Sequence, residues 1–424
     1  MNPSPIRVVA KFGGSSVSTP ERWQQIRRVA ADALERGDRL VIVHSALAGI
    51  TDLLEQSIVS ALDEQHAPLV ERIHARHDAL AEGLGIDAHE VLADDRVRLE
   101  RLLEGVALLG DAPPRVKAEV LSSGERMSTR LGARWLNDQG LSVTWLDARE
   151  LLVSVDPEVS GPGAWLSARC DVDFDPLLRT RLDGVDGIVL TQGFTARSPA
   201  GDTVVLGRGG SDTAAAYLAA RISADRLEIW SDVPGMFTAD PRRVPQTRLL
   251  RRLDYREAQE IATTGGQVLH PRCIPAVRDQ GIEIHMRSTL DPELEGTVIS
   301  AQADDGPASL KAISAKLNVV LLSLETLGMW QEVGFFSRAT EVLARAGLSL
   351  DLVSTSESNI TLSLDAAANL LDEALLERVC EELGAFCRVE VIRPCAAVSL
   401  VGSRIRGLLH RLGPALEAFE EHRV

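Results

Sequence analysis

The chain has 424 residues, enough for two or three domains with a large buried core, and its composition is that of a globular protein with few aromatic residues. Its formal net charge of −16 excludes general binding to nucleic acid or to an anionic membrane, because both need a cationic surface. An anionic ligand would therefore need a local cationic pocket.

Neither a membrane span nor a secretory signal is predicted. No apolar run approaches the ~20 residues that cross a bilayer, and residues 1–5 are polar and lead directly into a strand. The five cysteines are odd in number and form no Cys-x-x-Cys pair, which indicates free thiols in a reducing compartment. We expect a cytoplasmic protein.

The first elements alternate between strand and helix. Residues 6–12 are typical of a buried strand, and a helix is expected over about 21–36, with Thr19 as its cap and Gly37 as its end. A strand at 40–43 and a helix from Thr51 follow. This order predicts a parallel sheet that is covered on both faces.

The next segment, residues 55–115, is helical and charged, and we expect a peripheral helical layer. A helix is predicted to open at 122–125, and a hairpin turn is predicted at 195–202. Further strands are expected in the rest of a first domain that spans residues 1–300, at 142–146, 187–190, 203–206, 226–230 and 283–286.

A change of composition at 301–308 predicts a linker. Beyond it, short strands and helices are expected in the order βαββαβ, which is ferredoxin-like; the strands are 317–323, 348–353, 359–364 and 387–391, and the helices 335–346 and 369–383. We expect this domain to span 309–395. Residues 396–424 resemble the start of a second such unit, with a strand at 396–401 and a helix over 405–420, and this unit is incomplete.

Three glycine-marked turns, at residues 11–16, 207–212 and 230–235, each follow a strand-like run. Glycine lets an anion approach the backbone N–H groups without a Cβ in the way. Three such turns, with a lysine and arginines, indicate a site that holds a polyphosphate beside a second anion.

Other nucleotide motifs are absent from the sequence: there is no Walker A loop, no Gly-x-Gly-x-x-Gly after the first strand, and no protein-kinase signature. No Ser/His/Asp order is evident, and the nine histidines show no metal-ligand spacing. His270 is expected to cap or pack a turn, and no metal site made by protein ligands is predicted.

The remaining pattern fits phosphoryl transfer to a carboxylate, which needs alignment and charge neutralisation and no general base. Lys11, the glycine amides and Mg²⁺ would offset the repulsion between the two anions. Lys11 lies within an apolar strand, where an unpaired ammonium is costly, so an anionic partner is expected. Arg208 suits a substrate carboxylate, whereas Asp212 and Glu125 are read either as functional residues or as helix caps.

Over almost its whole length the chain resembles the aspartate kinases of the amino-acid-kinase fold, a three-layer α/β/α sandwich followed by ferredoxin-like ACT units. The resemblance rests on several motifs at family spacing: Lys-Phe-Gly-Gly-Ser-Ser-Val at 11–17, Ser-Ala-Leu-Ala-Gly-Ile-Thr at 45–51, Ser-Ser-Gly-Glu at 122–125, Thr-Gln-Gly-Phe at 191–194, Gly-Arg-Gly-Gly-Ser-Asp at 207–212, Trp-Ser-Asp-Val-Pro-Gly at 230–235 and Val-Leu-His-Pro at 268–271.

The resemblance implies roles in the first domain. Lys11 would contact the transferred phosphate, with Gly13 and Gly14 along its path, and Arg208 and Asp212 would complete the catalytic set. The substrate pocket would comprise Ser45, Thr51, Glu125, Phe194, Arg208 and Ser211, with Glu125 on the substrate ammonium. ATP would contact Ser231, Asp232, Phe237, Arg242 and Gln267.

Three of these positions depart from the family pattern. Ser231 replaces a usual threonine and Phe237 a common tyrosine, and both changes keep the size. Gln267 stands where many relatives have a lysine, so a charge is lost from the nucleotide pocket.

The C-terminal part is most like that of lysine-sensitive members, which implies an allosteric effector site and a homodimer that pairs through the ACT domains. The effector residues carried over are Met329, Gln331, Gly334, Phe335, Asp351, Thr355 and Ser356; Phe335 is also read as a core residue.

The resemblance thus implies ATP- and Mg²⁺-dependent phosphorylation of L-aspartate to 4-phospho-L-aspartate, the first step of lysine, threonine and methionine synthesis, with feedback by lysine. A fusion with diaminopimelate decarboxylase is one explanation for the C-terminus. The alternatives are a kinase for another amino acid and a catalytically silent amino-acid sensor. Effector strength and the choice between dimer and tetramer stay open.

Overall fold

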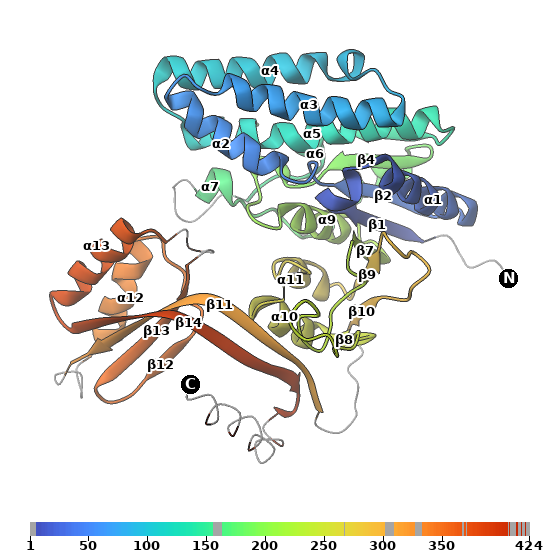
Figure 1. Ribbon diagram of the computed structural model, residues 1–424. Helices are drawn as coiled ribbons and strands as arrows, with labels where there is room; N and C mark the ends of the chain where they lie inside the picture. The colour runs from blue at the N-terminus through green and yellow to red at the C-terminus, as the bar shows by residue number, and fades with distance from the viewer. Residues whose placement is uncertain are drawn as a thin grey trace. The chain divides into compact units, whose positions relative to one another are not determined.

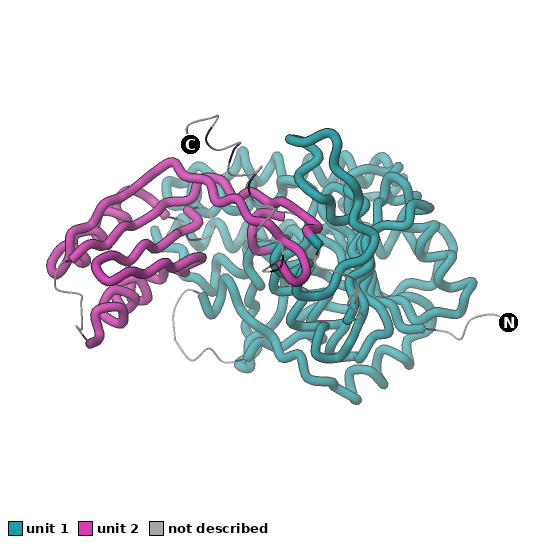
Figure 2. The backbone as a smooth tube through the Cα atoms, turned by 90° about the horizontal axis from the view of Figure 1, so that it is seen from below, with its two compact units in different colours: residues 1–262, 267–309 teal, residues 263–266, 310–424 magenta. Residues whose placement is uncertain are grey.

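The computed structural model describes residues 6–155, 163–266, 268–301, 309–326, 333–366, 369, 371–405, 407, 413, 417 and 420. The chain divides into two compact units, the first made of residues 1–262 and 267–309 and the second of 263–266 and 310–424 (Figure 2). Each unit is described by itself.

The described part of the first unit is built on an eight-stranded sheet with the order β3-β4-β2-β1-β7-β9-β10-β8. All of its recorded pairings are parallel except that of β9 with β10. The strands are β1 (Arg7–Phe12), β2 (Arg39–His44), β3 (Val143–Leu146), β4 (Ile188–Gln192), β7 (Arg226–Ser231), β8 (Arg252–Asp254), β9 (Glu283–Ser288) and β10 (Thr297–Ser300).

Strand β1 shows how the sheet is covered on both faces. Val8, Ala10 and Phe12 belong to the core that also contains residues of α1 (Pro20–Arg36) and of the long helices that follow. The alternation of a strand directs Lys11 to the opposite face, where it meets α9 (Gly210–Arg221). Helices on both faces give the predicted three-layer α/β/α fold (Figure 1).

Four long helices form the predicted helical layer, at the top of Figure 1. They are α2 (Ile50–Leu62), α3 (Ala67–Leu84), α4 (Ala88–Leu109) and α5 (Pro114–Asp138). The predicted helix start at 122–125 is wrong, because these residues lie in the middle of α5 and are all buried. Gly124 lets a neighbouring element pack closely, because a Cβ on it would lie 3.0 Å from Cβ of Ala46.

The hairpin predicted at 195–202 is confirmed: β5 (Thr195–Arg197) pairs antiparallel with β6 (Thr203–Val205). The predicted cap of α1 by Thr19 and its end at Gly37 are also confirmed, and Gly37 has the left-handed φ of 77°. The shorter helices of this unit are η1 (Gly14–Val17, a 3₁₀ turn), α6 (Ala148–Leu151), α7 (Gly163–Leu166), α8 (Pro176–Asp183), α10 (Tyr255–Thr263) and α11 (Cys273–Arg278).

The second unit has a four-stranded sheet with the order β12-β13-β11-β14. Its chain order is β11 (Ser309–Glu325), α12 (Phe335–Arg345), β12 (Val353–Thr355), β13 (Asn359–Asp365), α13 (Glu373–Gly384) and β14 (Arg388–Ser403). The βαββαβ order confirms the ferredoxin-like prediction. The amphipathic faces of α12 and α13 pack on the sheet and close a separate core.

Two segments of this unit differ from the expected elements. Residues 348–352 are not in a strand, and β12 begins only at Val353. The two expected strands 387–391 and 396–401 are joined in the single strand β14, which begins at Arg388 and crosses the expected domain boundary at 395/396. Most of the helix expected over 405–420 lies outside the described residues.

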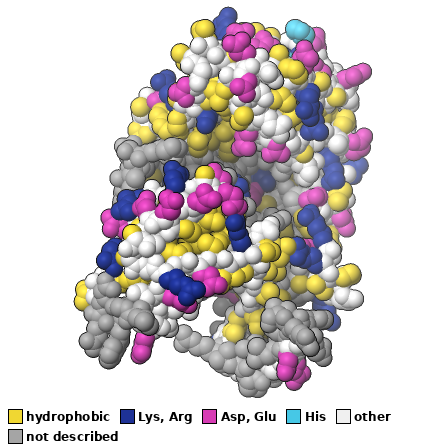
Figure 3. Space-filling model, turned by 60° about the vertical axis from the view of Figure 1, so that its left-hand side comes forward, with side chains coloured by type: hydrophobic (Ala, Val, Ile, Leu, Met, Phe, Trp, Pro, Cys, Tyr) yellow, Lys and Arg dark blue, Asp and Glu magenta, His cyan; other side chains and the backbone are white. Residues whose placement is uncertain are grey.

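None of the helices in the described part of the chain is long and apolar enough to cross a membrane. On the face drawn in Figure 3, Lys and Arg side chains are interspersed with Asp and Glu and do not gather into one basic patch.

Candidate active site

Several of the predicted site residues of the first unit lie at the ends of four neighbouring strands. Gly13 follows β1, Ser45 follows β2, Gly193 follows β4, and Ser231 ends β7. These strands are parallel, so their carboxyl ends meet at one edge of the sheet. This edge is where α/β proteins bind ligands, and the structure brings three glycine turns and the 45–51 segment together there.

Lys11 and Asp212 form an ion pair at this edge. The Lys11 Nζ atom lies 2.5 Å from Oδ1 of Asp212, and the two side chains are only 11% and 13% exposed. The anionic partner expected for Lys11 is thus provided in part by the protein. Asp212 is in the first turn of α9, where the helix dipole also favours a negative charge.

The first glycine turn passes directly over the Lys11 ammonium. A Cβ on Gly13 would lie 3.4 Å from Lys11 Nζ, and one on Gly14 would lie 2.9 Å from the carbonyl oxygen of Ala46. The N–H of Gly13 donates to the carbonyl of Trp230 over 3.2 Å, which ties this turn to the end of β7. Close packing therefore excludes a side chain at Gly14, whereas a Cβ on Gly13 would make only ordinary contact.

The second glycine turn leads into α9. Gly207 and Gly209 have φ values of 75° and 60°, which favour glycine. A Cβ on Gly210 would lie 2.5 Å from Cδ2 of Phe194, a residue that itself has a φ of 62°. The backbone N–H groups at the start of this 12-residue helix are a suitable cradle for an anion.

Arg208 stands between the two left-handed glycines of this turn. Its side chain is exposed and makes no ion pair with another described residue, so the guanidinium is available to a ligand. Ser211, one turn further on, is buried, and a Cβ on Gly193 would lie 2.5 Å from its Cβ.

His270 packs under this turn, as predicted. A Cβ on Gly209 would lie 2.4 Å from the imidazole Cγ, and the Arg272 N–H donates to Nδ1 over 3.3 Å. Burial and the charge of Arg272 lower the pKa of His270 below its ordinary value. The ring is therefore neutral at pH 7 and acts as a packing group.

The interpretation of Glu125 as a helix cap is wrong, because the residue lies inside α5. Its side chain is buried, and the adjacent Gly124 packs against Ala46 of the 45–49 loop. Burial raises the pKa of Glu125 to about 8, although the backbone of Glu125 itself and that of Ala46 act in the opposite direction. The carboxyl group is protonated at pH 7 until a cation pairs with it.

Two of the residues predicted to contact ATP, Ser231 and Asp232, lie in the third turn. The Ser231 hydroxyl donates to the carbonyl of Val233 over 2.9 Å, which fixes the turn. Asp232 and Arg242 are exposed, and Phe237 is half-buried. Gln267 lies outside the described residues.

The effector residues lie in the second unit. Phe335 is buried and stacks edge-on against Phe386, with ring centroids 5.7 Å apart, so its packing role is confirmed. Asp351 accepts a hydrogen bond from Nζ of Lys316 over 3.1 Å. Gly334 caps α12 with a φ of 91°, Thr355 and Ser356 are exposed, and Met329 and Gln331 lie outside the described residues.

Sequence reasoning missed two residues that support this site, Ser18 and Arg76. Both hold the backbone of Ala48, in the loop after β2. Ser18 directly follows the first motif, but nothing in the sequence shows that the two segments meet. Arg76 lies in a charged helix with no motif around it.

Comparisons with known proteins agree with this geometry. The model of the amino acid kinase family matches residues 7–288. The chain belongs to this family. It is 34% identical to the lysine-sensitive aspartokinase 3 of Escherichia coli over 93% of this chain and 87% of the relative, which places it among the aspartokinases of the amino acid kinase family.

Solved structures of aspartokinases are similar to this amino acid kinase. The crystal structure of E. coli aspartokinase III in complex with aspartate and ADP has a TM-score of 0.81 at 31% identity, over 96% of this chain and 91% of that one. The structure of the same enzyme in complex with lysine and aspartate has a TM-score of 0.71 at 33% identity, over 93% and 87% of the two chains.

Proposed function

We propose that the chain transfers the γ-phosphoryl group of MgATP to the side-chain carboxylate of L-aspartate, and that lysine inhibits this reaction. The observation that carries the proposal is the pair of Lys11 and Asp212 between two glycine turns, with the buried carboxyl of Glu125 below the adjoining loop. The E. coli relative binds aspartate and ADP in its crystal structure.

The residues of the chain would position and neutralise the two anions. Lys11, the amides of Gly13 and Gly14 and the start of α9 suit the phosphate groups, because all of them offer positive charge or N–H donors. The free guanidinium of Arg208 suits the α-carboxylate of aspartate by a bidentate contact. Glu125 would pair with the substrate ammonium, and Ser45, Thr51, Phe194 and Ser211 would complete the pocket.

The donor set fits a magnesium ion that arrives with ATP. No group of three or more His, Cys, Asp or Glu side chains that could hold a metal occurs among the described residues. Mg²⁺ commonly binds substrate phosphates with only one or two carboxylates and keeps several waters. Asp212 offers a hard carboxylate beside Lys11, and the ion would neutralise phosphate charge.

The remaining assignments concern the second unit and the assembly. The E. coli relative also binds lysine together with aspartate. We extend lysine regulation to this chain through the ACT-type unit over 309–395, with a homodimer paired through these units. A cytoplasmic location, a linker at 301–308 and a further unit from 396 remain predictions.

The test is ADP release in a coupled assay with MgATP, aspartate or glutamate, and with or without lysine. We expect turnover with aspartate, little with glutamate, and inhibition by lysine. Turnover with another amino acid would assign a different kinase. Saturable lysine binding without turnover on any substrate would identify a silent sensor and refute the proposal.

A further inference from the structure

The hydroxyl group of Ser18 joins the first glycine turn to the loop after β2. Ser18 caps η1 at the end of the first glycine turn. Its Oγ donates to the carbonyl of Gly14 over 2.6 Å and accepts the backbone N–H of Ala48 over 2.9 Å. Because the same hydroxyl is both donor and acceptor, a shift of either backbone segment is transmitted to the other.

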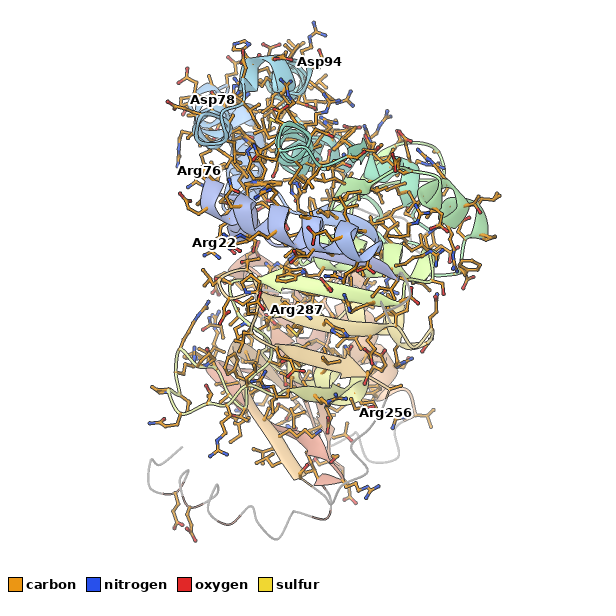
Figure 4. The ribbon with its side chains drawn as sticks, turned by 90° about the vertical axis from the view of Figure 1, so that its right-hand side faces the viewer. Arg22, Arg76, Asp78, Asp94, Arg256 and Arg287 are labelled. Carbon is orange, nitrogen blue, oxygen red and sulfur yellow. The ribbon has the colours of Figure 1, made fainter. Side chains whose placement is uncertain are left out.

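The carbonyl group of Ala48 is held from the helical layer. Arg76 on α3 donates from Nη1 to the carbonyl of Ala48. Figure 4 labels Arg76 below Asp78 of the same helix, on the side of the molecule where Arg22 of α1 is labelled. Arg76 has no ion pair with another described residue, and a Cβ on Gly49 would lie 3.1 Å from its Nη1.

The loop is also in close contact with the site on its inner side. The N–H of Ser45 donates to the carbonyl of Phe12 over 3.2 Å. A Cβ on Gly14 would lie 3.4 Å from the backbone nitrogen of Ala48, so the two segments touch. On α5, a Cβ on Gly124, next to Glu125, would lie 3.0 Å from Cβ of Ala46. Anything that displaces Ala48 therefore displaces the pocket loop relative to the phosphate turn.

We propose that Ser18 and Arg76 are positioning residues that fix the pocket loop (residues 45–51) against the phosphate turn (residues 11–17), so that the two substrates meet in line. This inference rests on the proposed function, since it takes the two segments as the binding places of the amino acid and the nucleotide. Neither residue touches a substrate; both act through Ala48. A misplacement of about 1 Å costs phosphoryl transfer as much as 100-fold in rate.

The first test is Ser18→Ala in the full chain. We expect kcat to fall about 10-fold or more, while the Kd values of aspartate and MgATP, measured separately by calorimetry, change less than about threefold. Ser18→Thr keeps a hydroxyl and should restore most of kcat. A general loss of structure would instead weaken both bindings and lower the melting temperature.

Arg76 provides an independent test with a matched control. Arg76→Ala should lower kcat, and Arg76→Lys should restore part of it. Arg72→Ala, which changes another exposed arginine one turn earlier on the same helix, should have no effect. Since Ser18 and Arg76 hold the same peptide segment, the double variant should lose clearly less than the product of the two single losses.

Two results would overturn the inference: wild-type kcat in Ser18→Ala, or strictly multiplicative effects in the double variant. Both are read against the wild-type chain in the same assay. If the wild-type chain itself shows no aspartate-dependent ADP release, it is the proposed function that fails.

Discussion

Lys11 forms a buried ion pair that has both a structural and a chemical consequence. Its ammonium is almost buried, and Asp212 neutralises it within the protein. A buried pair of this kind costs desolvation and adds little net stability. The pair is better explained by a ligand that adds negative charge at the same place, where the start of α9 and the glycine amides also contribute positive potential.

Substitution of Lys11 tests this explanation. Lys11→Met should lower kcat by about 100-fold or more, since it removes a transition-state contact, and should also lower Tm, because Asp212 is left without its partner. The double variant Lys11→Met/Asp212→Asn should recover Tm and not kcat. Recovery of both would show that the lysine serves stability alone.

The buried proton of Glu125 predicts a pH dependence. Because its pKa is raised to about 8, the free enzyme must release a proton when the substrate ammonium pairs with the carboxylate. The KM for aspartate should therefore fall as pH rises from 6 to 8. In Glu125→Gln the KM should be higher and independent of pH over this range, and equal profiles for the two proteins would contradict the assignment.

The same pKa shift has a consequence for folding. A carboxyl group whose pKa is raised in the folded state stabilises that state at low pH, and the contribution is lost as pH rises through the folded pKa, here about 8. Glu125→Gln cannot ionise. Its Tm relative to the wild type should increase between pH 6 and pH 9.

At the scale of elements, the start of α9 depends on glycines with no room for a side chain. Gly210→Ala would place a Cβ against Phe194 and should raise the KM for aspartate about tenfold, because the Phe194 segment must move. Gly105→Ala, in the open interior of α4, is the matched control and should be neutral or slightly stabilising. An unchanged KM in Gly210→Ala would show that Phe194 is not part of the aspartate pocket.

The sequence predicted the elements with strong local signals. Thr19, Pro20 and Gly37 mark the ends of α1, and the strand–turn pattern marks β1 and the hairpin. It failed where the signals were ambiguous: Ser-Ser-Gly-Glu at 122–125 resembles a helix start, yet Gly124 is there because α5 packs closely on the loop after β2. Glu125 remains a predicted site residue, and its burial is a property of the packed layers that the sequence does not show.

The residues that support the site could not be predicted either, because their contacts also depend on how separate elements pack. Ser18 and Arg76 meet Ala48 only because three separate elements converge. Hydrophobic periodicity fixes which face of α3 is buried, but it does not specify which residue an exposed arginine will contact. By contrast, Arg208 lies inside a glycine motif, and its availability could be anticipated.

At the scale of the whole molecule, the second unit offers a test of regulation by lysine. Nζ of Lys316 lies 3.1 Å from a carboxylate oxygen of Asp351 and 3.5 Å from one of Asp365. An ammonium group of the protein is therefore already paired with Asp351, one of the predicted effector residues. Lys316→Met should remove the ammonium from the Asp351 carboxylate and lower the lysine concentration for half-inhibition several-fold. Asp351→Asn should raise that concentration.

The control for this test is Arg388→Met, which removes a cation from an exposed pair in the same unit. It should leave the inhibition curve unchanged. A shift of the same size in Arg388→Met and Lys316→Met would mean that net charge, and not the occupied carboxylate, sets the response.

The continuous strand β14 matters for anyone who exchanges regulatory modules between such kinases. A junction placed at residue 395 would divide strand β14 near its middle and expose an unpaired strand edge that is prone to associate with other chains. Chimeras should instead carry Arg388–Ser403 as an uninterrupted piece, with the splice in a neighbouring connection.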